Sequence, residues 1–145
     1  MKNYTFRPVN EKDYPFIQLM FIEVAAVSDP HLAVDSYMSV HDFQRIIIGI
    51  VVENQKHTPL GAVWLQRTSD TPTLWIGIIP EYRQKGIGSN LLIKFYTVLL
   101  DTGINDICLH VDSQNNQAIY IYKKHGWIIE NDKSSEFITM KKKIL

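Results

Sequence analysis

The pattern of apolar and polar positions divides the chain into helical and extended stretches. Near its start, apolar side chains recur every three or four residues, which predicts an amphipathic helix. Asn10 lies where a cap belongs, and Glu11 and Asp13 complement the helix dipole in the first turn. A short strand is predicted before this helix, over residues 4–9, and a second helix after it, over residues 31–44.

Three apolar runs rich in β-branched residues follow, and polar turns separate them. They predict three strands joined as an antiparallel meander, over residues 46–53, 60–66 and 73–79. Gly77 interrupts the third run, which indicates a bulge or a close approach of another backbone; a glycine tolerated for packing gives the same pattern. Pro80 ends this strand because proline has no N–H to donate to a ladder.

The second half of the chain alternates between helix and strand. Helices are predicted over residues 86–100 and 117–125, and strands over residues 104–111, 127–129 and 137–141. Because the strand at 104–111 follows a strand and a long helix, we expect it to lie parallel to the strand at 73–79. The order of elements predicts an α+β fold, a mixed sheet with helices packed against it.

Length and composition limit the classes of protein to which the chain can belong. The chain has 145 residues, 46% of them apolar, which suits one domain over residues 1–145. Lys plus Arg and Asp plus Glu both number 15, and this balance argues against a general nucleic-acid binder. The single cysteine, Cys108, is expected in the core. No window is long enough to span a bilayer, so we expect a soluble cytoplasmic protein, with no metal site and no membrane partner.

A basic loop with two glycines lies between the strand at 73–79 and the next helix. It contains Arg83, Lys85, Gly86 and Gly88. The first turn of a helix has unpaired N–H groups and a positive dipole end, and glycine allows an anion to approach them. The loop therefore predicts a phosphate site, although a glycine-eased turn with solvated basic residues gives the same local pattern.

Two longer patterns extend this observation. The sequence I-I-P-x-x-R-x-x-G-I-G-x-x-L-L at residues 78–92 resembles the acetyl-CoA signature of the GNAT acyltransferases (GCN5-related N-acetyltransferases). The sequence N-x-x-A-x-x-x-Y-x-K-x-G-W at residues 115–127 resembles the second signature of that family. Two positions depart from the family pattern: Gln84 stands where glycine is frequent, and Trp127 where phenylalanine is usual.

The resemblance implies a single GNAT acetyltransferase domain with a mostly antiparallel sheet. In this family two parallel middle strands splay apart and admit the pantetheine arm of acetyl-CoA, the cosubstrate. The implied reaction is transfer of the acetyl group to a primary amine of a small molecule, peptide or protein by direct attack in a ternary complex. Nucleic acid is not an implied partner, and the protein is expected as a monomer or homodimer.

The resemblance also implies roles for particular residues. The loop would take the pyrophosphate, the backbone at residues 76–78 would hold the pantetheine arm, and the Ile78 N–H would stabilise the oxyanion. Asn115 would bind the pantetheine arm, a role compatible with capping a helix. The implied cofactor-binding residues are Ile76, Gly77, Ile78, Arg83, Gln84, Lys85, Gly86, Ile87, Gly88, Ser89, Asn115 and Tyr122.

Two residues are implied in catalysis. Tyr122 matches the family's general acid, which protonates the CoA sulfur; a tyrosine buried for packing would have the same spacing. Many relatives use a glutamate before the glycine loop, but residues 73–76 include no carboxylate. His110 occupies the position where other relatives carry an acidic residue, and histidine can accept a proton near neutrality. A histidine with no catalytic role, with water as the base, is the alternative.

Other interpretations lead to other tests. A non-catalytic acyl-CoA-binding or regulatory module is the main alternative to an enzyme, because a strand carboxylate is missing. A nucleotide-phosphate module is disfavoured, because the sequence has no G-x-x-x-x-G-K-[ST] run. Acceptor choice is expected to lie with the first two helices and the first hairpin, where the polar or aromatic candidates are Ser28, Asp29, His31, Tyr37 and Glu53.

Overall fold

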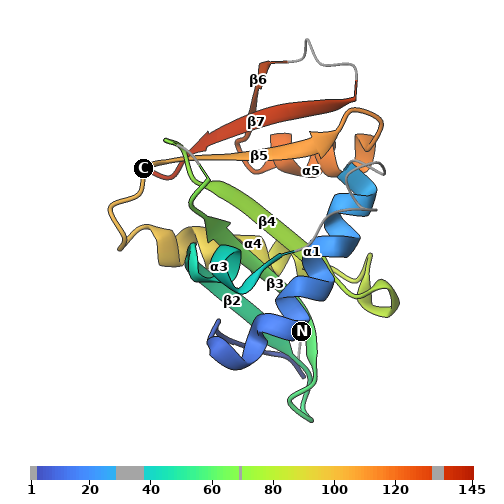
Figure 1. The fold of residues 1–145 in the computed structure, drawn as a ribbon. Coiled ribbons are helices and arrows are strands. Elements are labelled where there is room, and N and C mark those ends of the chain that lie inside the picture. Colours follow the sequence, from blue (N-terminus) through green and yellow to red (C-terminus); the bar gives the residue numbers. More distant parts are fainter. Residues whose placement is uncertain (1–2, 29–37, 69, 132–135) are drawn as a thin grey trace.

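The computed structural model describes residues 3–28, 38–68, 70–131 and 136–145, which form a seven-stranded sheet with helices on both faces (Figure 1). The strands are β1 (Thr5–Pro8), β2 (Ile46–Glu53), β3 (Pro59–Gln66), β4 (Thr73–Ile78), β5 (Asp106–Asp112), β6 (Ile128–Asn131) and β7 (Phe137–Lys143). The α-helices are α1 (Tyr14–Ser28), α3 (Val40–Gln44), α4 (Ile87–Leu99) and α5 (Asn116–Lys124). Two 3₁₀ turns, η1 (Glu11–Asp13) and η2 (Pro80–Tyr82), precede α1 and α4.

The sheet confirms the predicted α+β fold. Its strand order is β1-β2-β3-β4-β5-β7-β6, and all neighbouring strands are antiparallel except β4 and β5. The meander of β2, β3 and β4 and the parallel direction of β5 are therefore confirmed. Of the second predicted helix, the structure describes only the end, α3; Asp29, His31 and Tyr37, three of the acceptor candidates, lie outside the described residues.

Of the alternatives considered for Gly77, a bulge is excluded in its pairing with β3, and a close approach of another backbone is found. The ladder between β3 and β4 runs without a break from Gly61 opposite Ile78 to Gln66 opposite Thr73. A Cβ atom on Gly61 would lie 2.7 Å from the Gly77 carbonyl oxygen, so the glycine required at this contact is Gly61. The register shifts of this part of the sheet lie in the pairing of β2 with β3, between Ile46 and Ile48 and between Val52 and Glu53.

Two hydrophobic cores lie on opposite faces of the sheet. The larger one is under α4, where Ile87, Leu91 and Phe95 pack on alternate side chains of the strands. The smaller one is under α1, where Ile17 and Met20 pack on the other face. Figure 1 shows α1 and α4 on these opposite faces. None of the helices in the described stretches is both long and apolar enough to cross a bilayer.

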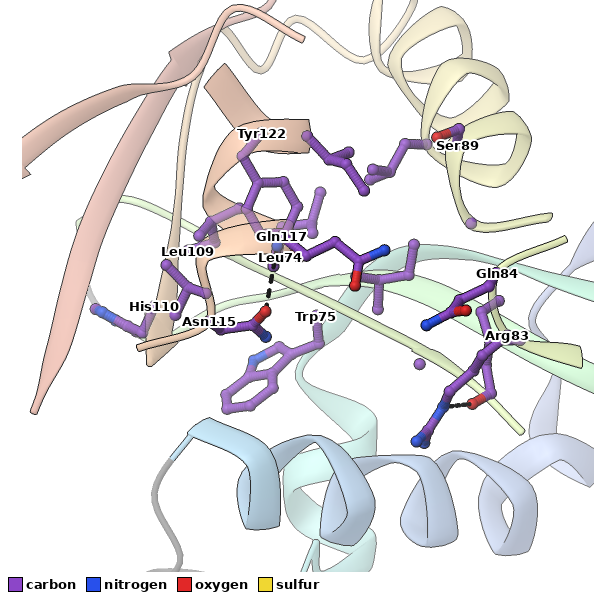
Figure 2. A pocket seen from close by; sticks show the side chains of 18 residues that line it. Leu74, Trp75, Arg83, Gln84, Ser89, Leu109, His110, Asn115, Gln117 and Tyr122 are labelled. Atoms are coloured by element: carbon purple, nitrogen blue, oxygen red, sulfur yellow. Dashed lines mark hydrogen bonds between the residues drawn. The ribbon is translucent and has the colours of Figure 1, made fainter. Parts of the chain in front are cut away.

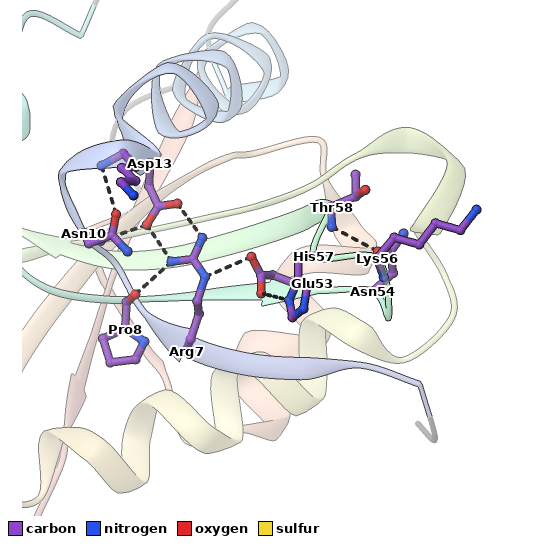
Figure 3. A network of polar contacts seen from close by, with 10 residues as sticks. Arg7, Pro8, Asn10, Asp13, Glu53, Asn54, Lys56, His57 and Thr58 are labelled. Atoms are coloured by element: carbon purple, nitrogen blue, oxygen red, sulfur yellow. Dashed lines mark hydrogen bonds and ion pairs between the residues drawn. The ribbon is translucent and has the colours of Figure 1, made fainter.

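A buried network of charges ties the entry to α1 to the sheet (Figure 3). Arg7 donates two hydrogen bonds to the Asp13 carboxylate, at 2.8 and 2.7 Å, and its Nε donates to Glu53 Oε2 at 2.9 Å. Both carboxylates are buried. Asp13 also accepts from the Asn10 backbone N–H, which completes the predicted cap. Glu53 is thus occupied in the fold and does not line the site described below.

The Arg7→Gln substitution is expected to destabilise the fold by about 2 kcal/mol, because it leaves two buried carboxylates without their cation. The partial exposure of the Arg7 side chain keeps the cost below that of a fully buried pair. Urea unfolding measures the change. The exposed Lys12→Gln, which removes the same charge from the neighbouring turn, is the control and should change stability little. Equal stability of the two variants would contradict the role given to Arg7.

Candidate active site

β4 and β5 pair at one position and then separate. Thr73 lies opposite Cys108, and the Cys108 N–H donates to the Pro72 carbonyl at 3.0 Å. Beyond this pair a cavity of about 360 Å³ opens between the two strands and the first residues of α4 and α5 (Figure 2). The expected splayed parallel pair is therefore present, and Cys108 is buried at its closed end, as predicted.

The backbone of β4 turns alternate groups toward this cavity. In an antiparallel ladder the N–H and C=O of one residue point to the same neighbour, and those of the next residue point the other way. The Ile79 N–H donates to β3, whereas the Pro72 carbonyl serves β5. The backbone N–H and C=O groups of Ile76 and Ile78 therefore point to the β5 side, where β5 has diverged from β4. Arg83 Nε donates to the Ile78 carbonyl at 2.8 Å and joins the loop to this edge.

The glycine loop leads directly into α4. Gly86 is the N-cap and has φ +82°, a conformation that favours glycine, and a Cβ there would meet no atom within 4 Å. Gln84 also has positive φ, at 61°, which is a physical reason for glycine being frequent at this position of the signature. The first helical bond runs from the Asn90 N–H to the Gly86 carbonyl. The N–H groups of residues 87–89 precede it and form an open, positive helix end suited to an anion.

Asn115 begins the helix on the opposite side of the cavity. Its Oδ1 accepts from the Ala118 N–H at 3.2 Å, so it caps α5, and the side chain also lines the cavity. The cap uses the oxygen and leaves the amide nitrogen for a ligand carbonyl. The two roles considered for Asn115 are thus geometrically compatible.

Tyr122 lies about two turns further along α5 and lines the same cavity (Figure 2). Burial raises the pKa of its hydroxyl to about 12, so the group is protonated at neutral pH. Its ring packs edge-on against Trp127 at 6.0 Å between ring centroids. Trp127 Nε1 in turn donates to Tyr96 Oη at 2.8 Å, a bond that the usual phenylalanine could not make. The hydrogen bond to Tyr96 therefore fixes the indole of Trp127, which in turn supports the Tyr122 ring.

His110 lies on the opposite face of β5. Its neighbours Leu109 and Val111 are in the core under α4, so His110 projects toward the α1 face. Nδ1 is 3.0 Å from Thr139 Oγ1, and in Figure 2 the ring points away from Tyr122. Partial desolvation against the sheet lowers the pKa of His110 below its usual value, so the imidazole is neutral at pH 7.

Most of the predicted site residues meet at this cavity. Those that line it are Ile76, Gly77, Ile78, Arg83, Gln84, Gly88, Ser89, His110, Asn115 and Tyr122. Three others do not. The Lys85 Nζ lies over the Tyr82 ring, 5.2 Å from its centroid, and Ile87 is buried in the core. Gly86 has no side chain and forms the N-cap of α4. No Asp or Glu is among the described lining residues, and no group of three metal-ligand side chains is found in the described part.

Two lining residues that carry polar side-chain atoms, Trp75 and Gln117, were missed in the sequence. Trp75 was considered only as a position without a carboxylate, yet strand alternation with Gly77 could have placed its indole on the α1 face. Gln117 stands at an x position of the second signature, where the pattern accepts any residue, so the pattern gave no signal for it. Tyr96, behind the cavity, has helical spacing with Leu92 and Leu99, but its bond to Trp127 joins residues 31 positions apart and has no local signal.

Comparisons with known proteins agree with this geometry. A family model described as "Acetyltransferase (GNAT) family" matches residues 12–127. The spermidine N(1)-acetyltransferase of Thermoplasma acidophilum is 36% identical over 63 residues, which cover 43% of this chain and 39% of that protein. A mycothiol acetyltransferase of Corynebacterium aurimucosum is 28% identical over 80 residues, covering 52% and 26%. The match thus spans less than half the length of either curated relative.

Solved structures share the fold over almost the whole chain. The ribosomal-protein-S18-alanine N-acetyltransferase from Escherichia coli aligns with a TM-score of 0.71 at 20% identity, covering 97% of this chain and 94% of that one. A spermidine/spermine N-acetyltransferase, SpeG from Vibrio cholerae in mutant forms, gives 0.73 at 19%, covering 99% and 95%. The protein yncA from Salmonella typhimurium, solved with its cofactor acetyl-CoA, gives 0.73 at 17%, covering 99% and 95%.

Proposed function

The chain belongs to the GNAT acetyltransferase family, and from that premise we propose that it is an N-acetyltransferase that uses acetyl-CoA. The acetyl group passes directly to a primary amine within a ternary complex. The observation that carries this proposal is the cavity between β4 and β5, which has an open helix N-terminus on one side and a protonated tyrosine on another. The Salmonella neighbour solved with acetyl-CoA has this fold and supports the choice of cofactor.

The cofactor takes its place along the edge that β4 leaves unpaired. The pyrophosphate binds the N–H groups at the start of α4, with charge from Arg83 and Lys85. The pantetheine arm follows the polar backbone groups of Ile76 and Ile78, in place of a strand, and Asn115 donates to it from α5. This route leads the thioester from the glycine loop toward the closed end of the cavity.

The chemistry then needs three groups around the thioester. The amine attacks the carbonyl carbon, and the Ile78 N–H stabilises the negative charge that develops on the oxygen. The C–S bond breaks, and Tyr122 gives its proton to the departing thiolate, whose conjugate thiol has a pKa of roughly 8.5. The amine loses its proton to His110, which is neutral at pH 7.

The positions of the two proposed proton-transfer groups support their roles. Tyr122 packs with the core on the α4 side of the sheet, whereas His110 projects from the α1 face of β5. An amine that approaches from the His110 side therefore has the departing sulfur on its far side, near Tyr122. The acceptor is an amine of a small molecule or of a peptide; the named relatives act on spermidine and on a ribosomal-protein alanine.

Tyr122→Phe is expected to lower kcat about a hundredfold, the lower range for loss of a general acid. The affinity for acetyl-CoA should stay close to the wild-type value, because the ring is retained. Steady-state transfer to a panel of amines measures kcat, and calorimetry measures binding. Tyr120→Phe, which removes an exposed hydroxyl from the same helix, is the matched control. An unchanged kcat in Tyr122→Phe, or cofactor binding without turnover in wild type, would favour the non-catalytic module.

His110→Gln is expected to change the pH profile of kcat. A histidine base works only when neutral, so the wild-type kcat should rise with pH through the lowered pKa of His110 and be level above it. The variant should lose this rise and have a reduced plateau. The measurement is kcat at saturating acetyl-CoA and acceptor from acid to neutral pH. A rise that persists in His110→Gln would assign proton removal to water.

A further inference from the structure

One buried side-chain donor in the described part of the chain has no partner, the indole N–H of Trp75. The other two tryptophans are paired inside the protein. Trp64 Nε1 donates to Gln66 Oε1 at 3.2 Å, and Trp127 Nε1 donates to Tyr96 Oη at 2.8 Å. A donor that has lost water without gaining an acceptor is unfavourable, and such groups are rare in folded proteins. Within the described part of the chain, the indole N–H of Trp75 is therefore free to donate to an acceptor atom of a ligand.

The place of Trp75 shows where that atom must come from. Its ring packs against Phe21 of α1, with 4.9 Å between centroids, so it belongs to the α1 face of the sheet. It also lines the cavity between β4 and β5 (Figure 2). His110 projects from the same face of β5. Trp75 thus lies on the side from which the amine approaches in the proposed reaction.

The charges of the cavity separate two classes of amine. Among its described lining residues there is no carboxylate. A polyamine is a chain of cationic nitrogens and methylenes, so it gains no ion pair from this wall and offers no oxygen to the indole. An amine with a carbonyl on the neighbouring carbon supplies the missing acceptor and carries a single positive charge before reaction.

We propose that Trp75 selects the acceptor by donating its indole N–H to a carbonyl oxygen beside the reacting amine. The preferred acceptors are then the α-amino ends of peptides and amino-acid amides, rather than polyamines. This inference rests on the proposed acetyl transfer and names its substrate class. Phe21 holds the ring in place, and the hydrogen bond orients the α-amino group toward the thioester.

The direct test observes the three indole N–H signals by NMR in ¹⁵N-labelled wild-type protein with CoA, which has no acetyl group and allows no turnover. The Trp75 signal is assigned by its loss in Trp75→Phe. Addition of an alanyl-glycine amide should move the Trp75 proton downfield and leave the Trp64 and Trp127 signals in place. Spermidine should leave all three in place. A Trp75 signal that moves on addition of CoA alone would show that the indole N–H donates to an oxygen of the cofactor, and this would overturn the proposal. A Trp75 signal that the peptide amide leaves unmoved would also overturn it.

Kinetics supply the second test. Trp75→Phe should lower kcat/KM for the peptide amide about tenfold, the effect of one lost buried hydrogen bond, and leave the low value for spermidine unchanged. Trp64→Phe, which removes an indole N–H already paired within the core, is the control for packing losses and should keep the wild-type preference. Efficient transfer to spermidine with none to the peptide would overturn this inference and sustain the proposed function. Absence of acetyl-CoA binding would overturn the proposed function itself.

Discussion

The incomplete pairing of β4 with β5 is the constraint on which the site depends. Backbone N–H and C=O groups need partners once they are removed from water, and β4 satisfies its β3 side along its full length. On its β5 side, one pair at Thr73 and Cys108 holds the strands together, and the groups of Ile76 and Ile78 then face a cavity. An extended ligand with amide groups can complete such an edge. The sheet thus leaves a gap beside β4 where a further strand could pair. The pantetheine arm of acetyl-CoA, the cosubstrate of the family, is an extended chain with amide groups that could pair there.

The two faces of the sheet carry different groups of the proposed site. On the α4 side, the glycine loop provides the open helix end proposed for the pyrophosphate, and α5 provides Asn115 and Tyr122, backed by Trp127 and Tyr96. On the α1 side, His110 and Trp75 project toward the space where an acceptor would arrive. The network of Arg7, Asp13 and Glu53 ties the start of α1 to β1 and β2, and so holds this second face in position relative to the cavity. Cofactor and acceptor can therefore approach the same carbonyl from different sides.

The parts of this arrangement that follow from local sequence could be predicted, and those that depend on distant contacts could not. Apolar periodicity located β2 to β5 and α4, and the two glycines and Asn115 marked the helix starts that line the cavity. The choice between a bulge and a close backbone approach at Gly77 could not be made from the sequence, because the approaching residue, Gly61, lies 16 positions earlier. Glu53 was one of five unranked candidates for acceptor choice, and its structural role could not be seen because its partner, Arg7, lies 46 positions away. The unpaired N–H of Trp75 is visible only once the other buried side-chain donors of the described residues have been matched with acceptors.

Calorimetric titration with acetyl-CoA tests the central claim most directly, in wild type and in Gly88→Glu. Gly88 lies in the first turn of α4, and the nearest atom to an added Cβ is 4.0 Å away. Glutamate should therefore preserve or improve the stability of the helix while repelling a pyrophosphate there. The account predicts that wild type binds and that Gly88→Glu loses at least about tenfold in affinity. Thr97→Glu, on the exposed far end of the same helix, should bind as wild type does. Equal binding by all three proteins would move the cofactor away from this loop, and no binding by folded wild type would contradict the account.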